Sequence, residues 1–169
     1  MEVNVEIVLS YNDEETDWKV KKNISKFIYR LKKYRTGNRF SGEYTYKINQ
    51  DSGLYKQIIE FYKSNSKDVE LVFKEAIGVI DANADKGNIT VDGGLLEALR
   101  GIRFDHAHGT VNISNTEVKS EVLVTGGSAS STGTTTIKDN TILKTKGTSI
   151  SVGNGCSITM TGGATITQT

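Results

Sequence analysis

Two histidines two positions apart are the residues of this chain whose spacing best suits chemistry. His106 and His108 lie in the segment FDHAHGT and are the only histidines in the sequence. If a strand continues through this segment, both imidazoles point to the same side, where they could chelate a transition metal. A metal site needs about four ligands, so one chain would have to add Asp105 or other groups. The alternative is two exposed turn histidines, and we expect no cofactor unless an oligomer assembles a metal site here.

A second group of residues with chemical potential is basic. The early part of the chain carries Lys19, Lys21, Lys22, Lys26, Arg30, Lys32, Lys33, Arg35 and Arg39. On a helix they fall largely opposite an apolar stripe, so they form either an ordinary solvated face or a basic surface for phosphate or an acidic protein partner. The predicted basic surface consists of Lys22, Lys26, Arg30 and Lys33. Tyr29 could stack on bases, whereas Tyr34 belongs to the apolar stripe and is expected in the core.

The composition excludes several other classes of protein. The formal net charge of the 169 residues is +1, which argues against a nucleic-acid binder recognisable by bulk charge. The single cysteine, Cys156, excludes an intramolecular disulfide and a cysteine-based metal cluster. No run approaches the roughly 18 apolar residues that span a bilayer, and the acidic amino terminus lacks the features of a secretory signal. We therefore expect no membrane span and a cytoplasmic location, or a virion location if the chain derives from a phage.

The first half of the chain, residues 1–86, predicts a small α/β unit that caps the second half or binds a partner. Strands are indicated where apolar and polar residues alternate, and helices where apolar residues recur every three or four positions. Asn12 or Asp13 is a plausible helix cap. The predicted elements are a strand at 3–9, a helix at 14–35, a strand at 44–48, a helix at 54–62 and a strand at 69–73.

The second half, residues 87–169, is rich in glycine and threonine and repeats every 24 residues. Two lines of residues carry this period: Ile89, Ile113 and Ile137, and then Val118, Ile142 and Ile166. A third line of apolar triplets follows at 102–104, 122–124 and 150–152. Three short strands per repeat suit one coil of a parallel β-solenoid, because the chain goes once around a roughly triangular section and returns one strand spacing higher. The fold class predicted is α+β, with a small amino-terminal α/β unit followed by a short β-solenoid.

Two other arrangements fit the same spacing. Three chains could intertwine, each contributing one side of the triangle, although the lines at 24 residues favour a single chain that winds around itself. An antiparallel sandwich of short strands also suits regular spacings of about eight to twelve residues.

The threonine- and glycine-rich repeat with its Ile/Val ladders, residues 87–169, resembles the short β-helical segments of bactofilin-type cytoskeletal proteins and of phage tail spikes. In phage spikes a His-x-His pair, contributed by three chains around an axis, binds iron, and the pair His106 and His108 resembles it. More distantly, a small α/β unit attached to a repetitive module looks like the adaptor or sensor modules of bacterial conflict systems. The resemblance lies in the style of the repeat, and it carries over no functional residue.

A coil of this kind exposes unpaired backbone groups and an open apolar section at each end. The α/β unit can cap the first coil, whereas the segment ATITQT ends on a strand with no charged or proline-bearing residue to blunt it. We therefore expect a non-enzymatic structural or interaction protein that forms a homo-oligomer through its carboxy-terminal coil, at Ile158, Met160 and Ile166. A carbohydrate-active enzyme would need carboxylates aligned along one face of the coil, and the carboxylates of this half share no line.

Overall fold

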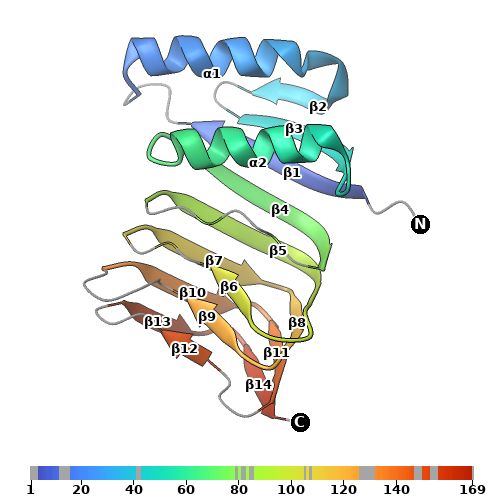
Figure 1. The fold of residues 1–169 in the computed structure, drawn as a ribbon, viewed down its shortest axis with the longest axis vertical. Helices are drawn as coiled ribbons and strands as arrows, with labels where there is room; N and C mark the ends of the chain where they lie inside the picture. Colours follow the sequence, from blue (N-terminus) through green and yellow to red (C-terminus); the bar gives the residue numbers. More distant parts are fainter. Residues whose placement is uncertain are drawn as a thin grey trace.

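The computed structural model describes residues 4–11, 16–40, 43–78, 80, 83, 86–104, 106, 108–125, 132–146, 150–152 and 156–168. An α/β region is followed by a β-solenoid of about four turns (Figure 1). The α/β region contains β1 (Asn4–Tyr11), α1 (Trp18–Arg30), the 3₁₀ helix η1 (Lys32–Tyr34), β2 (Arg35–Phe40), β3 (Glu43–Asn49), α2 (Gly53–Asn65) and β4 (Val69–Gly78).

The solenoid is built from short strands that pair in parallel with the strands of the next coil. Its strands are β5 (Asn88–Glu97), β6 (Ile102–Phe104), β7 (Thr110–Ser114), β8 (Glu117–Ser120), β9 (Leu123–Thr125), β10 (Thr134–Lys138), β11 (Ile142–Thr145), β12 (Ile150–Val152), β13 (Ser157–Met160) and β14 (Thr165–Gln168). One side of the coil stacks β5, β7, β10 and β13; the second stacks the end of β5 with β8, β11 and β14; the third stacks β6, β9 and β12. Because all these pairs are parallel and lie within one chain, the fold is a self-wound coil rather than a sandwich.

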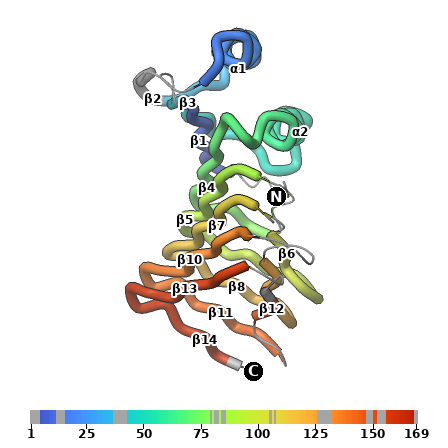
Figure 2. Tube along the Cα trace, turned by 90° about the vertical axis from the view of Figure 1, so that its left-hand side faces the viewer, coloured from blue at the N-terminus to red at the C-terminus, as the bar shows by residue number. Residues whose placement is uncertain are grey.

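The α/β region and the coil share one sheet. Its strand order runs β13-β10-β7-β5-β4-β1-β3-β2, so β4 joins the antiparallel part to the parallel part. β4 also bends with the coil, since Phe73 pairs with Val91 on the first side and Ile77 pairs with Leu95 on the second. β4 thus acts as a preliminary coil, and the sheet is continuous across residue 86. Figure 2 shows α1 and α2 on the same side of this sheet as β6.

Every coil turns the corner between its first and second sides through residues with positive φ. Glycine occupies this corner in two coils, at Gly93–Gly94 and Gly162–Gly163, and Asn115, Asp139 and Asn140 occupy it in the others. Glycine, asparagine and aspartate enter this left-handed region at lower cost than other residues. At Gly94 a side chain would also collide with the Ala76 carbonyl oxygen of β4. The corner therefore explains why these residue types recur in the repeat.

The buried apolar residues form one cluster that runs from the α/β region into the coil. Phe27 of α1 stacks on Phe61 of α2, with ring centroids 4.0 Å apart. Leu71 and Phe73 of β4 are fully buried and pair with Ile89 and Val91 of the first coil. The core is thus continuous beneath the helices and inside the coil.

Four points about the α/β region need correction. The first helix spans Trp18–Arg30 instead of 14–35, and its cap is Asp17, whose carboxylate accepts from the Lys19 amide at 2.8 Å. Residues 35–40 form the unpredicted strand β2. Tyr34 is 43% exposed, since the chain leaves the α-helix after Arg30 and the 3₁₀ turn no longer continues the apolar stripe.

The predicted period of 24 residues is confirmed between β7 and β10, where Ile113 pairs with Ile137, and is wrong elsewhere. Val111 pairs with Ile89, 22 positions earlier, and Ile113 pairs with Val91 instead of Ile89. On the second side Leu143 pairs with Val118, while Ile142 pairs with Glu117 and faces outward. A constant period assumes equal corners, whereas three residues separate β10 from β11 and two separate β7 from β8. The extra residue places Leu143 inside the coil in the position predicted for Ile142.

Candidate functional site

The two histidines lie in different environments. β6 ends at Phe104, so no strand carries His106 and His108 to a common face. His106 is buried, whereas His108 is exposed in a turn. Asp105, the proposed additional ligand, lies outside the described residues. Among the residues that the structure describes, no group of three or more His, Cys, Asp and Glu side chains could hold a metal ion, and a site shared between chains stays a prediction.

His106 instead joins the coil to the α/β region. Its Nε2 lies 2.8 Å from the Tyr62 Oη of α2, within hydrogen-bond distance, and both residues are buried. Burial raises the pKa of Tyr62 well above its ordinary value, so the phenol stays protonated. The phenol can then donate to the Nε2 of an imidazole that carries its proton on Nδ1. The sequence gives no signal for this contact, because it depends on how α2 packs over the first coil.

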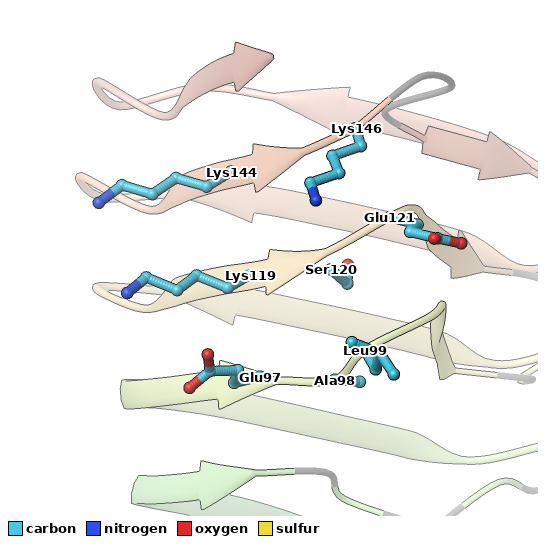
Figure 3. A pocket seen from close by; sticks show the side chains of 8 residues that line it. All are labelled: Glu97, Ala98, Leu99, Lys119, Ser120, Glu121, Lys144 and Lys146. Carbon is cyan, nitrogen blue, oxygen red and sulfur yellow. The ribbon is translucent and has the colours of Figure 1, made fainter. Parts of the chain in front are cut away.

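A shallow hollow of about 340 Å³ lies where the second side of the coil turns toward the third. Its lining is Glu97, Ala98, Leu99, Lys119, Ser120, Glu121, Lys144 and Lys146. Figure 3 shows the ammonium groups of Lys119 and Lys144 pointing away in the same direction, while Lys146 turns toward Ser120. The carboxylates of Glu97 and Glu121 lie on opposite sides and point away from each other (Figure 3). Paired-carboxylate catalysis needs two carboxyl groups flanking one bond, which this arrangement does not provide.

The lysines beside this hollow are engaged with a neighbouring carboxylate. Glu117 Oε1 lies 2.7 Å from Lys144 Nζ and 3.8 Å from Lys119 Nζ. The hydrogen bond from Lys144 and the charges of both lysines hold the pKa of Glu117 below its ordinary value. Lys119 and Lys144 are also paired in register on adjacent strands, so Glu117 separates two like charges. This cluster therefore stabilises the stacking of coils, although exposed ion pairs of this kind contribute little each.

The four residues of the predicted basic surface share one exposed region. Lys22, Lys26 and Arg30 are exposed on α1, and Lys33 is exposed on η1 directly after it. The opposite face of α1 buries Ile24, Phe27 and Ile28. The sequence thus located this surface, while it missed the exposure of Tyr34 beside it.

The last coil presents an uncovered end. Among the described residues, β13 pairs only with β10, and β14 pairs only with β11. Ile158 and Met160 are half-buried against the core, and Ile166 is 43% exposed. The corresponding inward residues of the first coil, Ile89 and Leu96, are fully buried. The predicted assembly residues therefore lie together at this end.

Backbone hydrogen bonds show which groups point to the uncovered edge. The Ser157 and Thr161 amides donate to the carbonyls of the coil before, at 3.0 and 2.9 Å. Backbone groups of successive residues alternate in direction along a strand, so those of Ile158 and Met160 point the other way. The Thr165 amide likewise donates to the Thr141 carbonyl. The backbone groups of the next residue, Ile166, therefore point to the free edge. Each predicted assembly residue thus contributes backbone groups to this edge and an apolar side chain to the open section.

The opposite end carries a cover that the sequence did not reveal. The Gln50 side chain accepts from the Ile77 amide at 3.2 Å and donates to the Ile77 carbonyl at 2.6 Å. Its amide thus takes the place of a strand beside the bent half of β4. A single glutamine in a turn has no pattern that would predict this contact.

The fold and these surfaces define an α+β protein in which a parallel β-solenoid extends the sheet of an α/β region. Comparisons with protein-family models, with curated proteins and with solved structures find no match for the chain. The resemblance to bactofilins and tail spikes therefore stays a prediction. Neither helix in the described ranges has the length and apolar character that crossing a membrane requires.

Proposed function

We propose that this chain is a non-enzymatic interaction protein that dimerises through its uncovered coil, with β13 and β14 of two copies facing each other. The observation that carries the proposal is the edge itself, where the backbone of Ile158, Met160 and Ile166 faces no further strand among the described residues and their apolar side chains are partly exposed. Exposed regular edges of this kind are templates for pairing with another chain.

A second copy suits this edge because it brings no charge repulsion. The sequence contains no Asp, Glu, Lys or Arg after Lys146, so neither β13 nor β14 carries a charge. Protective devices at natural sheet edges include charged side chains, proline and bulges, and β13 pairs regularly with β10 without any of them. Two such edges can therefore meet directly.

Symmetry favours a closed dimer over a filament. The opposite end of the coil is occupied by β4 and its neighbours, so the described part of the chain offers the open section once. Two identical surfaces meet about a two-fold axis, which sets the facing strands antiparallel and closes the assembly. The other edge of the common sheet is β2, whose pairing with β3 shifts register between Thr36 and Phe40. Such an irregularity makes β2 a poor template for further chains.

Light scattering with size-exclusion chromatography over a wide concentration range tests this proposal. We expect the mass to double with concentration in the natural chain and to remain that of one chain in Ile166→Lys, since a lysine at this inward position would place a charge in the apolar section that the dimer buries. Thr165→Lys is the matched control, because it adds the same charge on the adjacent exposed residue, in register with the uncharged Ile142, and should still dimerise. A natural chain that remains monomeric, or an Ile166→Lys variant that dimerises equally well, would overturn the proposal. A closed trimer would favour the phage spike or fibre alternative, and filaments would favour a cytoskeletal polymer.

A further inference from the structure

The exposed face of α1 and η1 combines basic and aromatic side chains, and no role above accounts for it. Between Trp18 and Arg35 the chain has eight basic residues and no acidic one. The nearly neutral net charge of the whole chain conceals this local excess. α1 lies at the end of the molecule farthest from β13 and β14 (Figure 1), so assembly through the last coil leaves this face accessible.

Three aromatic rings are exposed among these positive charges. Trp18 is 66% exposed, Tyr29 68% and Tyr34 43%. Each ring has an ammonium group close to it: Lys19 Nζ lies 5.8 Å from the Trp18 ring centroid, Lys32 Nζ 4.3 Å from that of Tyr29, and Lys33 Nζ 5.0 Å from that of Tyr34. A planar group stacked on one of these rings would therefore have a positive charge beside it.

These groups follow one line along the helix. Trp18, Lys22, Ser25 and Tyr29 succeed one another at intervals of four, three and four residues, which places them on one stripe. At 1.5 Å per residue, Trp18 and Tyr29 are separated by about 16 Å along the helix axis. Lys22, Ser25, Lys26, Tyr29 and Arg30 line a shallow hollow of about 620 Å³ on this stripe. The stripe thus provides two stacking rings with positive charges between them.

We infer that this stripe binds single-stranded nucleic acid, with bases stacked on Trp18 and Tyr29 and phosphates held by Lys22, Lys26 and Arg30. Proteins that bind single strands without sequence preference combine a basic track with aromatic rings in this way. A duplex keeps its bases stacked inside, so its phosphates would contact the basic residues but its bases would not stack on Trp18 and Tyr29. An anionic membrane suits the stripe less well, because an interfacial helix inserts a continuous apolar face, and the apolar face of α1, with Ile24, Phe27 and Ile28, is turned into the protein.

Fluorescence titration tests this inference. The probes are oligo(dT) and oligo(U) of ten nucleotides, a DNA duplex of the same length and phosphatidylserine vesicles. Trp18 is the only tryptophan of the chain, so quenching of its emission reports stacking at this site. We expect both single strands to bind and to quench Trp18, and affinity to fall steeply between 50 and 200 mM salt, as counterion release requires.

Variants separate stacking from charge attraction. Tyr29→Ala should weaken binding by about five- to a hundredfold, and Tyr29→Phe should restore it, because stacking needs only the ring. Lys26→Gln should weaken binding and reduce the salt slope by about 0.7, whereas Lys56→Gln, a control on the exposed face of α2, should change neither. Ile166→Lys should bind as the natural chain does, which distinguishes this site from the assembly surface.

Three results would overturn the inference. Duplex binding as tight as single-strand binding would show that the site only attracts phosphates and does not stack bases. Binding unaffected by Tyr29→Ala would remove the stacking role, and vesicle binding without single-strand binding would identify a membrane surface instead.

Discussion

At one end of the solenoid, β4 carries the sheet onward into β1 and β3, α2 contacts the first coil through Tyr62 and His106, and Gln50 occupies the edge beside Ile77. At the other end, β13 and β14 each have one neighbouring strand among the described residues. Because each coil gains stability from its neighbours, the first coil is supported on both sides and the last on one. Among the described residues, the uncovered edge of the coil therefore lies at β13 and β14.

The largest expected difference in stability comes from the same substitution in the first and in the last coil, at two inward-facing positions of the same side. Ile89 and Ile158 belong to a ladder that runs through Val111 and Thr135. Ile89→Ala should lower the free energy of unfolding by about 2–5 kcal/mol, since its side chain is fully buried. Ile158→Ala should cost about 1 kcal/mol in dilute protein, because half-buried side chains lose less transfer free energy.

Urea denaturation at low micromolar concentration measures both values. Repeating it at high concentration should raise the cost of Ile158→Ala alone, since dimerisation stabilises the folded chain by mass action. Equal costs at the two positions in dilute protein would show that the last coil is as well supported as the first.

The contact between α2 and the coil should have the next largest effect. Tyr62→Phe removes the hydroxyl that bonds to His106, at a cost of about 1–3 kcal/mol, because a buried polar atom loses its partner. Tyr29→Phe is the control, since its hydroxyl accepts only a long bond of 3.3 Å from Lys32 at an exposed site and should contribute little. Thermal and urea unfolding measure both variants. A neutral Tyr62→Phe would mean that apolar packing alone joins α2 to the coil.

Sequence patterns predicted the uncovered end of the coil better than the end that joins the α/β region, for physical reasons. Apolar alternation located most of the strands, and the prediction of an uncovered last coil came from the segment ATITQT, which has no charged or proline residue. The constant period of 24 residues wrongly placed Ile142 in the interior, because the corner before β11 is one residue longer than the corner before β8. The burial of His106 and the role of Gln50 depend on contacts between segments distant in the chain, and neither leaves a periodic signal. Local patterns therefore predicted the strands of the coil well and its closure poorly.

Alkaline pH should destabilise the protein through its α/β region, since all seven tyrosines precede the solenoid. Burial raises the pKa of Tyr46 in β3 to about 12, with Arg35 opposing the shift. Above pH 10 the unfolded chain releases this proton while the folded chain retains it, so stability falls as pH rises. At pH 11 the loss from Tyr46 should be about 1.4 kcal/mol relative to pH 8.

The variant Tyr46→Phe isolates this effect. Its Oη is buried without a hydrogen-bond partner among the described residues, so removing it should not weaken the fold at pH 8. Urea midpoints at pH 8, 10 and 11 should therefore decline less in Tyr46→Phe than in the natural chain. Parallel declines would assign the alkaline loss to other groups.

The smallest expected effect concerns the glutamine that covers the edge of β4. Gln50→Ala should lower the free energy of unfolding by about 1 kcal/mol, because two backbone hydrogen bonds to Ile77 are exchanged for bonds to water at an exposed site. Gln50→Glu should cost a similar amount, since a carboxylate can accept from the amide but cannot donate to the carbonyl. Gln57→Ala, an exposed change on α2, is the matched control and should be neutral. Hydrogen exchange measured at the Ile77 amide by NMR gives the local readout, and it should accelerate in Gln50→Ala and remain slow in Gln57→Ala. Unchanged exchange at Ile77 would mean that this edge needs no cover, and the contrast between the two ends would then rest on α2 and the continued sheet alone.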